Sequence, residues 1–278
     1  MKRYFSILIF VLIFAQINWD AEIIDSTNFD NAWVGRWNSL QLDDSLQPHI
    51  VYSYMVTNIC SKIIYTVKRG GDWRKEVVDS VNYPYYLYGF SLRLGENNSP
   101  FLSYLKTRLE SPYSTYLFYG KRENGMWHIQ LLDSFPVESI SWPTSLALDT
   151  NNYPWIAYTY KPIVDTLWCI KCLFWDGISW NISYIRDSSQ LNNFINPSLE
   201  IGSDNQARII FYCQLSTGYQ TSVKYYIYDG NYWTMLWCDS SEQSSPAYHL
   251  DLELNRNDYP HIAYGKNYTL YWATFNGL

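Results

Sequence analysis

The sequence has few charged residues and no excess of basic ones. Its 20 Lys and Arg are outnumbered by 26 Asp and Glu, which gives a formal net charge of −6 and a charged fraction of 17%. A protein that binds nucleic acid through the phosphates needs a positively charged surface. Nucleic acid is therefore not expected as a partner.

Several motifs of enzymes and ion-binding proteins are also absent. The chain has no glycine-rich phosphate loop, no calcium-binding run of Asp residues and no Ser or Cys in a recognisable nucleophile turn. Its five cysteines are an odd number, so they cannot all pair in disulfides. Cys169 and Cys172 form a lone C-x-x-C without a second ligand pair, and residues three apart on a strand point to opposite faces. We expect no metal and no cofactor, and we interpret this pair as small buried hydrophobic residues.

One apolar run is long, and it lies at the start of the chain. Met1-Lys2-Arg3 is basic and precedes the apolar stretch from Tyr4 to Phe14. Eleven residues are too few for a stable membrane span, so we interpret residues 1–15 as a secretory signal and residues 16–278 as one domain. A retained N-terminal anchor is the alternative. No other stretch is suited to span a membrane, which predicts a secreted protein in the extracellular space, in the periplasm or at the cell surface.

Aromatic residues are abundant, and they recur with a fixed period. The chain has 27 Tyr and 13 Trp, and five of the Trp are separated by 54, 54, 53 and 53 positions: Trp19, Trp73, Trp127, Trp180 and Trp233. The same period separates five Asp-Ser pairs, which begin at Asp25, Asp79, Asp133, Asp187 and Asp239. A strand-rich repeat of this length is typical of a β-propeller. We expect the recurrent Trp to pack between blades and the Asp-Ser pairs to bond backbone groups at strand ends.

The third unit shows the strands of one repeat most clearly. Residues 145–149 alternate in polarity, an Asn- and Pro-containing turn follows, and residues 155–160 form a second apolar strand. Residues 167–175 and 180–185 are a third and a fourth strand, joined by a tight turn at Asp176-Gly177. Four antiparallel strands make one propeller blade, so the sequence predicts an all-β, five-bladed β-propeller.

The two ends of the chain predict how the ring closes. The last unit, residues 249–278, has its first three strands but lacks the Trp and the Asp-Ser pair. Residues 17–26 supply them in Trp19 and Asp25-Ser26. We therefore expect the N-terminal strand to pair with the C-terminal blade, which closes the ring and covers its free sheet edges. An open array of blades is the alternative.

This repeat resembles that of secreted β-propeller proteins near the sialidase-like, BNR-type propellers. The sequences Asp176-Gly177-Ile178-Ser179-Trp180 and Asp229-Gly230-Asn231-Tyr232-Trp233 match the turn of the sialidase Asp-box in part, and no complete box occurs. The arginine cluster of a sialidase cannot be placed on matching positions. The resemblance covers residues 16–278 and implies the propeller fold, without sialidase activity.

The segments between blades are rich in aromatic residues and vary from unit to unit. Because rings stack on the C–H faces of sugars while polar groups bond their hydroxyls, these segments suit a carbohydrate. We expect a binding module for a glycan or a cell-surface ligand, with candidate ligand-binding residues Trp33, Arg36, Trp37, Tyr85, Tyr88, Glu138, Trp142 and Phe194. Two alternatives are that the rings only plug the mouth of the propeller or cover the inner strands, and that the protein is a structural or protein-interaction ring.

One position of the first strand varies while its neighbours are nearly fixed. It is occupied in the five units by Gln41, Arg93, Ala147, Glu200 and Glu253. If these positions converge on the axis, Glu200 and Glu253 with Arg93 are candidate catalytic residues of a glycoside hydrolase, sialidase-like or arabinanase-like. Such an enzyme is our alternative to the binding module. An ion pair between blades, of Arg93 with a carboxylate, is the structural interpretation of the same residues.

Overall fold

The structure is a computed structural model that describes residues 21–135, 143–161, 168–186, 191–215, 221–241, 250–266 and 269–275. Within these ranges it is built of antiparallel strands in five sheets, with one short 3-10 turn at Glu96–Asn98. None of the described residues belongs to a helix that is long and apolar enough to cross a membrane. We call the sheets blades 1 to 5 in chain order.

The strands follow one another from the inside of each blade to the outside. Blade 1 contains β1 (Ala32–Leu42), β2 (Pro48–Val56), β3 (Cys60–Arg69) and β4 (Asp72–Asn82). Blade 2 contains β5 (Tyr85–Leu94), β6 (Pro100–Arg108), β7 (Ser114–Glu123) and β8 (Met126–Phe135). Blade 3 contains β9 (Ser145–Leu148), β10 (Pro154–Tyr160), β11 (Cys169–Trp175) and β12 (Trp180–Ile185). Blade 4 contains β13 (Leu191–Ile201), β14 (Ala207–Leu215), β15 (Thr221–Tyr228) and β16 (Trp233–Ser241). Blade 5 contains β17 (Leu250–Leu254), β18 (Pro260–Lys266) and β19 (Thr269–Thr274).

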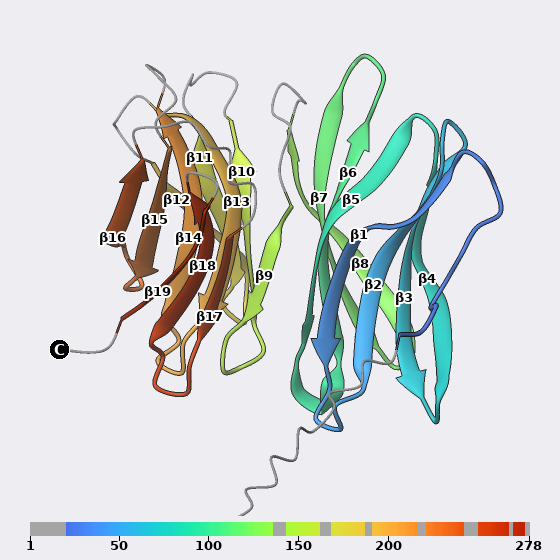
Figure 1. Ribbon diagram of the computed structural model, residues 1–278, viewed down its shortest axis with the longest axis horizontal. Helices are drawn as coiled ribbons and strands as arrows, with labels where there is room; N and C mark the ends of the chain where they lie inside the picture. The colour runs from blue at the N-terminus through green and yellow to red at the C-terminus, as the bar shows by residue number, and fades with distance from the viewer. Residues whose placement is uncertain are drawn as a thin grey trace, which may run out of the picture.

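The blades stand side by side around a common axis, as in a β-propeller. The innermost strands β1, β5, β9, β13 and β17 contact one another in this order (Figure 1). The expected four antiparallel strands are confirmed in blades 1 to 4, whereas the described part of blade 5 has three. The fold is therefore a propeller of five sheets, and the predicted tight turn at Asp176-Gly177 joins β11 to β12.

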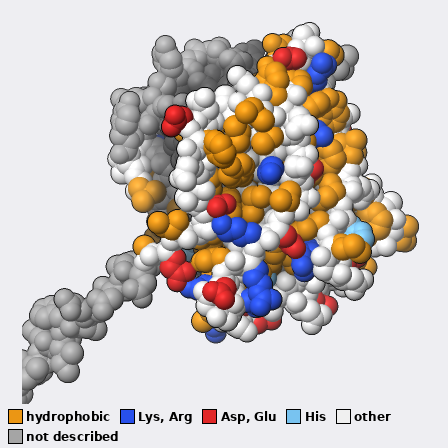
Figure 2. Space-filling model, turned by 90° about the vertical axis from the view of Figure 1, so that its right-hand side faces the viewer, with side chains coloured by type: hydrophobic (Ala, Val, Ile, Leu, Met, Phe, Trp, Pro, Cys, Tyr) orange, Lys and Arg blue, Asp and Glu red, His pale blue; other side chains and the backbone are white. Residues whose placement is uncertain are grey.

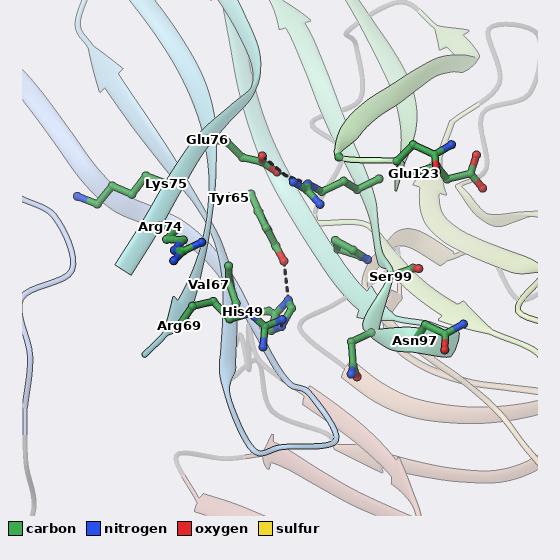
Figure 3. A pocket seen from close by; sticks show the side chains of 15 residues that line it. His49, Tyr65, Val67, Arg69, Arg74, Lys75, Glu76, Asn97, Ser99 and Glu123 are labelled. Carbon is green, nitrogen blue, oxygen red and sulfur yellow. Dashed lines mark hydrogen bonds and ion pairs between the residues drawn. The ribbon is translucent and has the colours of Figure 1, made fainter. Parts of the chain in front are cut away.

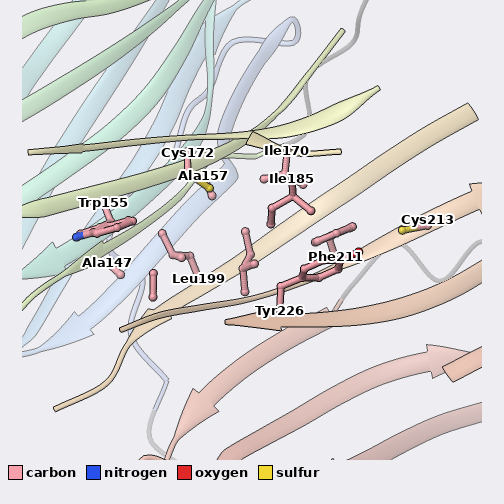
Figure 4. Packing of buried hydrophobic residues seen from close by; sticks show 12 residues of the cluster. Ala147, Trp155, Ala157, Ile170, Cys172, Ile185, Leu199, Phe211, Cys213 and Tyr226 are labelled. Carbon is pink, nitrogen blue, oxygen red and sulfur yellow. The ribbon is translucent and has the colours of Figure 1, made fainter. Parts of the chain in front are cut away.

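A hydrophobic core fills each of the four contacts between consecutive blades. The core between blades 3 and 4 contains Trp155, Ala157 and Cys172 from one blade and Leu199 and Phe211 from the other (Figure 4). Further cores lie between blades 1 and 2, blades 2 and 3, and blades 4 and 5. Blades 2, 3 and 4 are thus buried on both faces by their neighbours and blades 1 and 5 on one face each, and this burial supplies most of the stabilisation. The five cysteines, all among the described residues, form no disulfide, and Cys169 and Cys172 are both buried.

The recurrent Trp of the outer strands β8, β12 and β16 packs against the preceding blade, as predicted. The ring of Trp127 in blade 2 lies edge-on to Tyr65 of blade 1, with 5.5 Å between the ring centroids. Its Nε1 donates a hydrogen bond of 2.7 Å to Glu76 of blade 1. Trp180 makes the equivalent contacts with Tyr119 and Gln130 one blade further on.

A serine on each of the innermost strands β1, β5, β9 and β13 links it to the next blade. The Ser39 hydroxyl accepts the backbone N–H of Leu92 at 3.1 Å, and Ser91 accepts that of Leu146 at 3.0 Å. The same bond is made at the next two contacts, by Ser145 with Leu199 and by Ser198 with Leu252. These leucine N–H groups face away from the second strand of their own blade, so no strand of the same blade can accept from them. The serine of the neighbouring blade satisfies them instead.

The aspartate of the Asp-Ser pair has a partner that the sequence did not reveal. One carboxylate oxygen of Asp79 accepts the N–H of Ser80, as predicted, while the other accepts the hydroxyl of Tyr104 in blade 2 at 2.8 Å. Asp239 accepts the hydroxyl of Tyr264 in the same way at 2.7 Å. The signal for this pairing is a tyrosine that follows Asp79, Asp133 and Asp239 by 25 residues and Asp25 by 27.

The aromatic-rich composition of the segments between blades indicates loops, and for the first two segments this interpretation is wrong. The third and the fifth segments lie mostly outside the described residues. Residues 32–38 and 85–90 continue the innermost strands β1 and β5. A break in register lies between Val34 and Asn38 of β1 and between Tyr88 and Ser91 of β5. It contains a glycine with positive φ in each case, Gly35 at 75° and Gly89 at 68°. Such a bulge lets a strand bend and continue beyond the blade.

The predicted fourth strand of blade 5 is not seen in the part of it that the structure describes. Residues 21–29 are in no strand, and β19 pairs only with β18. In Figure 1, blade 5 in orange-red lies on the left and blade 1 in blue on the right. Leu40, which faces the blade 5 side, is 53% exposed, whereas its counterparts are at most 1% exposed: Leu92, Leu146, Leu199 and Leu252. Closure of the ring therefore stays a prediction.

The Tyr104–Asp79 bond gives a direct test of the links between blades. The substitution Tyr104→Phe keeps the ring and removes the hydroxyl, so Asp79 loses a neutral donor in a partly buried place. We expect the free energy of unfolding to fall by about 1.5–3 kcal/mol, the usual range for a hydrogen bond to a charged group. Urea unfolding measures it. Tyr232→Phe in an exposed turn is the control, and an equal effect of both substitutions would contradict a linking role.

The aspartate links also make stability depend on pH. Burial alone would raise the pKa of Asp239, but the ion pair with Lys266 and the hydrogen bond from Tyr264 outweigh it and hold the pKa below its usual value. Because the folded-state pKa is lowered, this contribution is present above the unfolded pKa of about 3.9 and is lost as the pH falls through the folded pKa. We expect Asp239→Asn to be less stable at pH 7 and to lose less stability on acidification. Thermal unfolding from pH 7 to pH 3, with Asp44→Asn as control, checks both signs.

Candidate functional site

The variable position of the innermost strands forms a charged cluster near the axis. Arg93 of β5 donates from Nη2 to Oε1 of Glu200 on β13 at 2.5 Å. Arg93 belongs to blade 2 and Glu200 to blade 4, so the pair reaches past blade 3, where Ala147 leaves room for it. This contact is the ion pair that the structural interpretation expects, and it also brings two of the three candidate catalytic residues together.

The electrostatics of the cluster centre on Glu200. Burial raises the pKa of its carboxyl above the usual value, the positive charge of Arg93 lowers it, and the negative charge of Glu253 raises it again. Asp251, two residues before Glu253 on β17, acts in the same direction as Glu253. The carboxyl of Glu200 is thus held toward its protonated form although Arg93 is beside it, and Glu253 is close enough to affect its charge.

The backbone explains why these residues converge. Each stands one residue before the end of its innermost strand, next to the turn that leads to the second strand. The side chains of Arg93 and Glu200 are 23% and 19% exposed, so solvent reaches the pair. Buried carboxyls with opposed environments are the usual source of paired acid and base groups, and this cluster can therefore hold and release a proton.

Three of the predicted aromatic ligand-binding residues, Trp37, Tyr85 and Tyr88, pack against other side chains of the protein. Trp37 of β1 donates from Nε1 to the Tyr86 hydroxyl at 2.9 Å, and its ring lies 5.9 Å from that of Tyr88. Tyr86 and Tyr88 of β5 are stacked at 5.6 Å. Tyr85 lies under the ammonium group of Lys106 at 4.9 Å. The contacts of Trp37 join blades 1 and 2, which agrees with the alternative that the rings cover the inner strands.

Trp33 differs from the other aromatic candidates because its ring is open to solvent. It is 53% exposed, and the guanidinium of Arg36 lies 5.9 Å from its centroid. Of the other candidates, Glu138 and Trp142 lie outside the described residues, and only the backbone of Phe194, within β13, is described.

The two candidate groups lie at opposite ends of the propeller. Trp33 is the second residue of β1 and Gln41 the second from its end, so eight residues of strand, about 26 Å, separate the two levels. In Figure 1, β1 runs from its first residues at the upper end to its arrowhead at the lower end. A small ligand bound at one end would not touch the other.

A polar pocket between blades 1 and 2 was not predicted. It has a volume of about 810 Å³ and opens between the turn at residues 97–100 and the hairpins that follow β3 and β7. Its walls carry His49, Tyr65, Arg69, Arg74 and Arg122 (Figure 3). Figure 2 shows most charged side chains of this side of the molecule in its lower part, below a mainly hydrophobic upper part.

The side chains at the base of this pocket form a hydrogen-bond network. His49, 2% exposed, shares a bond of 2.5 Å with the Tyr65 hydroxyl, and Asp43 accepts from Arg69 at 2.9 Å. Burial lowers the pKa of His49, against the effect of Asp43, so this histidine is neutral near pH 7. Sequence comparison of the units could have found the pocket, because Phe101 and Arg208 stand where blade 1 has His49. Among the described residues, no group of three or more His, Cys, Asp and Glu could hold a metal ion.

Comparison with known structures supports the propeller fold. The chain is similar to an alpha-L-arabinanase of Penicillium chrysogenum, with a TM-score of 0.57 and 12% identity over 86% of this chain and 76% of that one. It is also similar to a Dyadobacter fermentans protein of unknown function, with a TM-score of 0.55 and 11% identity over the same shares. An alpha-L-arabinofuranosidase of Fusarium graminearum gives a TM-score of 0.52 at 8% identity over 86% and 79%. No family model and no curated protein matches the sequence. At these identities the likeness shows the fold alone.

The charged cluster predicts opposite effects of two substitutions on one group. Arg93→Gln removes the positive charge that lowers the pKa of Glu200, so this pKa should rise further. Glu253→Gln removes a negative charge that raises it, so the pKa should fall. Carboxyl titration followed by NMR in selectively labelled protein measures both. Shifts of the same sign in the two variants would show that Glu253 and Arg93 do not act on Glu200 as the geometry indicates.

Proposed function

We propose that the protein is a carbohydrate-active enzyme that hydrolyses glycosidic bonds at the axial end where Glu200 and Glu253 lie. The observation that carries this proposal is the partly buried carboxyl of Glu200, 19% exposed, whose pKa is raised by its burial and by a second carboxylate. Glu200 donates a proton to the leaving oxygen of the glycosidic bond. Glu253 supplies the carboxylate that either activates water or attacks the anomeric carbon, the two roles known for such pairs.

Arg93 is a positioning residue in this proposal. Its bond of 2.5 Å fixes the orientation of the Glu200 carboxyl, while burial and Glu253 still keep the pKa raised. A carboxyl that is fixed and held toward its protonated form meets two conditions for a general acid near neutral pH.

The substrate class comes from the structural neighbours. The Penicillium enzyme is described in complex with arabinobiose, and the Fusarium enzyme as an alpha-L-arabinofuranosidase. We infer an oligosaccharide substrate, with arabinose-containing chains as the first to test. Sialidase-like activity is not proposed. Secretion after removal of residues 1–15 is part of the proposal, because a polysaccharide substrate lies outside the cell.

The proposal includes a closed ring. Glu253 stands on blade 5 and Gln41 on blade 1, so the wall of the axial site is complete only when these blades meet. Closure would also cover the side chain of Leu40 and bring the exposed Asp251 near the backbone of Leu40.

Glycan binding without cleavage is a second candidate function. It is favoured by one observation, the exposed Trp33 ring with Arg36 at 5.9 Å on the opposite end of the propeller. A ring and a guanidinium side by side can stack on a sugar and bond its hydroxyls.

Hydrolysis assays on Glu200 variants test the main proposal. Arabinan, arabino-oligosaccharides and a panel of other plant and bacterial oligosaccharides are incubated with the protein, and products are identified by mass spectrometry. We expect Glu200→Gln to lower kcat by about 10²- to 10⁴-fold, the usual contribution of a general acid. Glu253→Gln should lower it as well.

Matched controls separate the two candidate functions. Glu123→Gln alters a carboxylate in the turn between β7 and β8 and should leave the rate unchanged. Cleavage by the Glu200 variant at the wild-type rate would refute the catalytic role. Binding of an oligosaccharide without any product, lost in Trp33→Ala, would instead support the second candidate.

A further inference from the structure

Blades 4 and 5 enclose an apolar groove at the outer side of their contact. It has a volume of about 780 Å³, and its walls include Tyr225, Ile227, Trp237, Ile262 and Phe275. Its lower rim is the turn at residues 257–260, the counterpart of residues 97–100 at the contact of blades 1 and 2. A cavity thus lies at the same place in the contact of blades 1 and 2 and in that of blades 4 and 5. Its lining is polar in the first contact and mainly hydrophobic in the second.

At other contacts this place is occupied by the recurrent Trp of the outer strand. Between blades 2 and 3, Trp180 lies against Tyr119, and the space left has a volume of about 260 Å³. Between blades 1 and 2, Trp127 lies against Tyr65. Tyr225 is the counterpart of these tyrosines in blade 4, but the described part of blade 5 has no fourth strand and therefore no Trp to place there.

The described N-terminal residues already follow the course of a fourth strand against blade 1. Glu22 accepts the Nε1 hydrogen of Trp73 at 2.9 Å, as Glu76 does for Trp127 at 2.7 Å. Asp25 accepts the Tyr52 hydroxyl at 2.7 Å, as Asp79 does for Tyr104. Residues 22–25 thus make toward blade 1 the contacts that β4 makes toward blade 2.

We propose that residues 17–25 complete blade 5 as its outer strand and that the side chain of Trp19 fills the apolar groove between blades 4 and 5. Trp19 precedes Glu22 by three residues, as Trp73 precedes Glu76. The counterparts in β7 and β8 set the register: Arg122 faces Trp127, Gly120 faces Ile129 and Phe118 faces Leu131. In blade 5 the same register places Trp19 opposite Phe275, Ala21 opposite Ala273 and Ile23 opposite Tyr271.

The exposed side chains at the open contact fit this occupant. Ile23 is 85% exposed, and on β19 Trp272 is 67% and Leu270 is 80% exposed. On the face of blade 5 that turns toward blade 1, Ala263 is exposed, whereas its counterparts are fully buried: Val51, Ser103, Ala157 and Ile210. Pairing with β19 would cover its free edge, and the meeting of blades 5 and 1 would bury these residues and Leu40. The docking of Trp19 does not depend on any glycan activity.

A disulfide trap tests the register in the processed chain, residues 16–278. In the double variant Ala21→Cys with Ala273→Cys, the two residues face each other on neighbouring strands, within reach of a disulfide. We expect an intramolecular disulfide on mild oxidation, identified by mass spectrometry of the linked peptides. The pair Ala21→Cys with Leu270→Cys is the control, because its second residue is three positions out of register.

Trp19 itself is tested in the same trap. Trp19→Ala in the double-cysteine background should lower the yield of the disulfide by roughly tenfold or more, because a large buried ring is lost. Trp33→Ala, which removes an exposed ring, should not change it. Equal yields for both cysteine pairs, or a yield unaffected by Trp19→Ala, would overturn the proposal. Linkage only between two chains would show that a second copy fills the groove.

Discussion

A propeller blade has two faces, and both have to be covered. Four contacts between blades meet this need with the same set of interactions: a shared hydrophobic core, a serine that accepts the N–H of a leucine in the next blade, and an outer-strand residue that accepts from a Trp or Tyr of its neighbour. Because the residues recur with the repeat, each contact repeats the geometry of the one before it. The arrangement of the whole chain follows from this single type of contact.

The candidate site depends on the same arrangement. The repeat brings one position of every innermost strand to the same level near the axis, and the sequence varies the residue placed there. Ala147 leaves space, Arg93 reaches across it, and Glu200 is held in a buried place beside a second carboxylate. The repeated fold brings these positions together, and the residues that differ between units at this position provide the charges and the proton-binding group. Chemistry at such a site can change while the contacts between blades stay the same.

The sequence predicts the fold well because the fold is periodic. Strand order, the tight hairpin turns and the packing of Trp127 and Trp180 between blades follow from residues that recur in each unit. The extension of the innermost strands was missed, although Gly35 and Gly89 are 54 residues apart and mark the bulges. The local composition of these segments indicates a loop. They are strands because they pair with the second strand of the blade.

The site was less predictable than the fold, for a physical reason. The pairing of Arg93 with Glu200 joins blades 2 and 4, and only the position of both around the axis shows it. The pocket of His49 and Tyr65 likewise joins side chains of blades 1 and 2, which the pattern of one unit does not show. Burial, which sets the pKa of Glu200, is a property of the assembled ring rather than of any one unit.

The central claim is that the contact between blades 5 and 1 is of the same kind as the other four. Asp251 stands at the position of the linking serines, and the N–H that it would accept is that of Leu40. Amide hydrogen exchange of Leu40, measured by NMR in the processed chain, tests this directly. The account predicts protection comparable to that of Leu92 and Leu146, whose N–H groups donate to serines. Exchange of Leu40 at the rate of an exposed amide, with Leu92 and Leu146 protected, would contradict it.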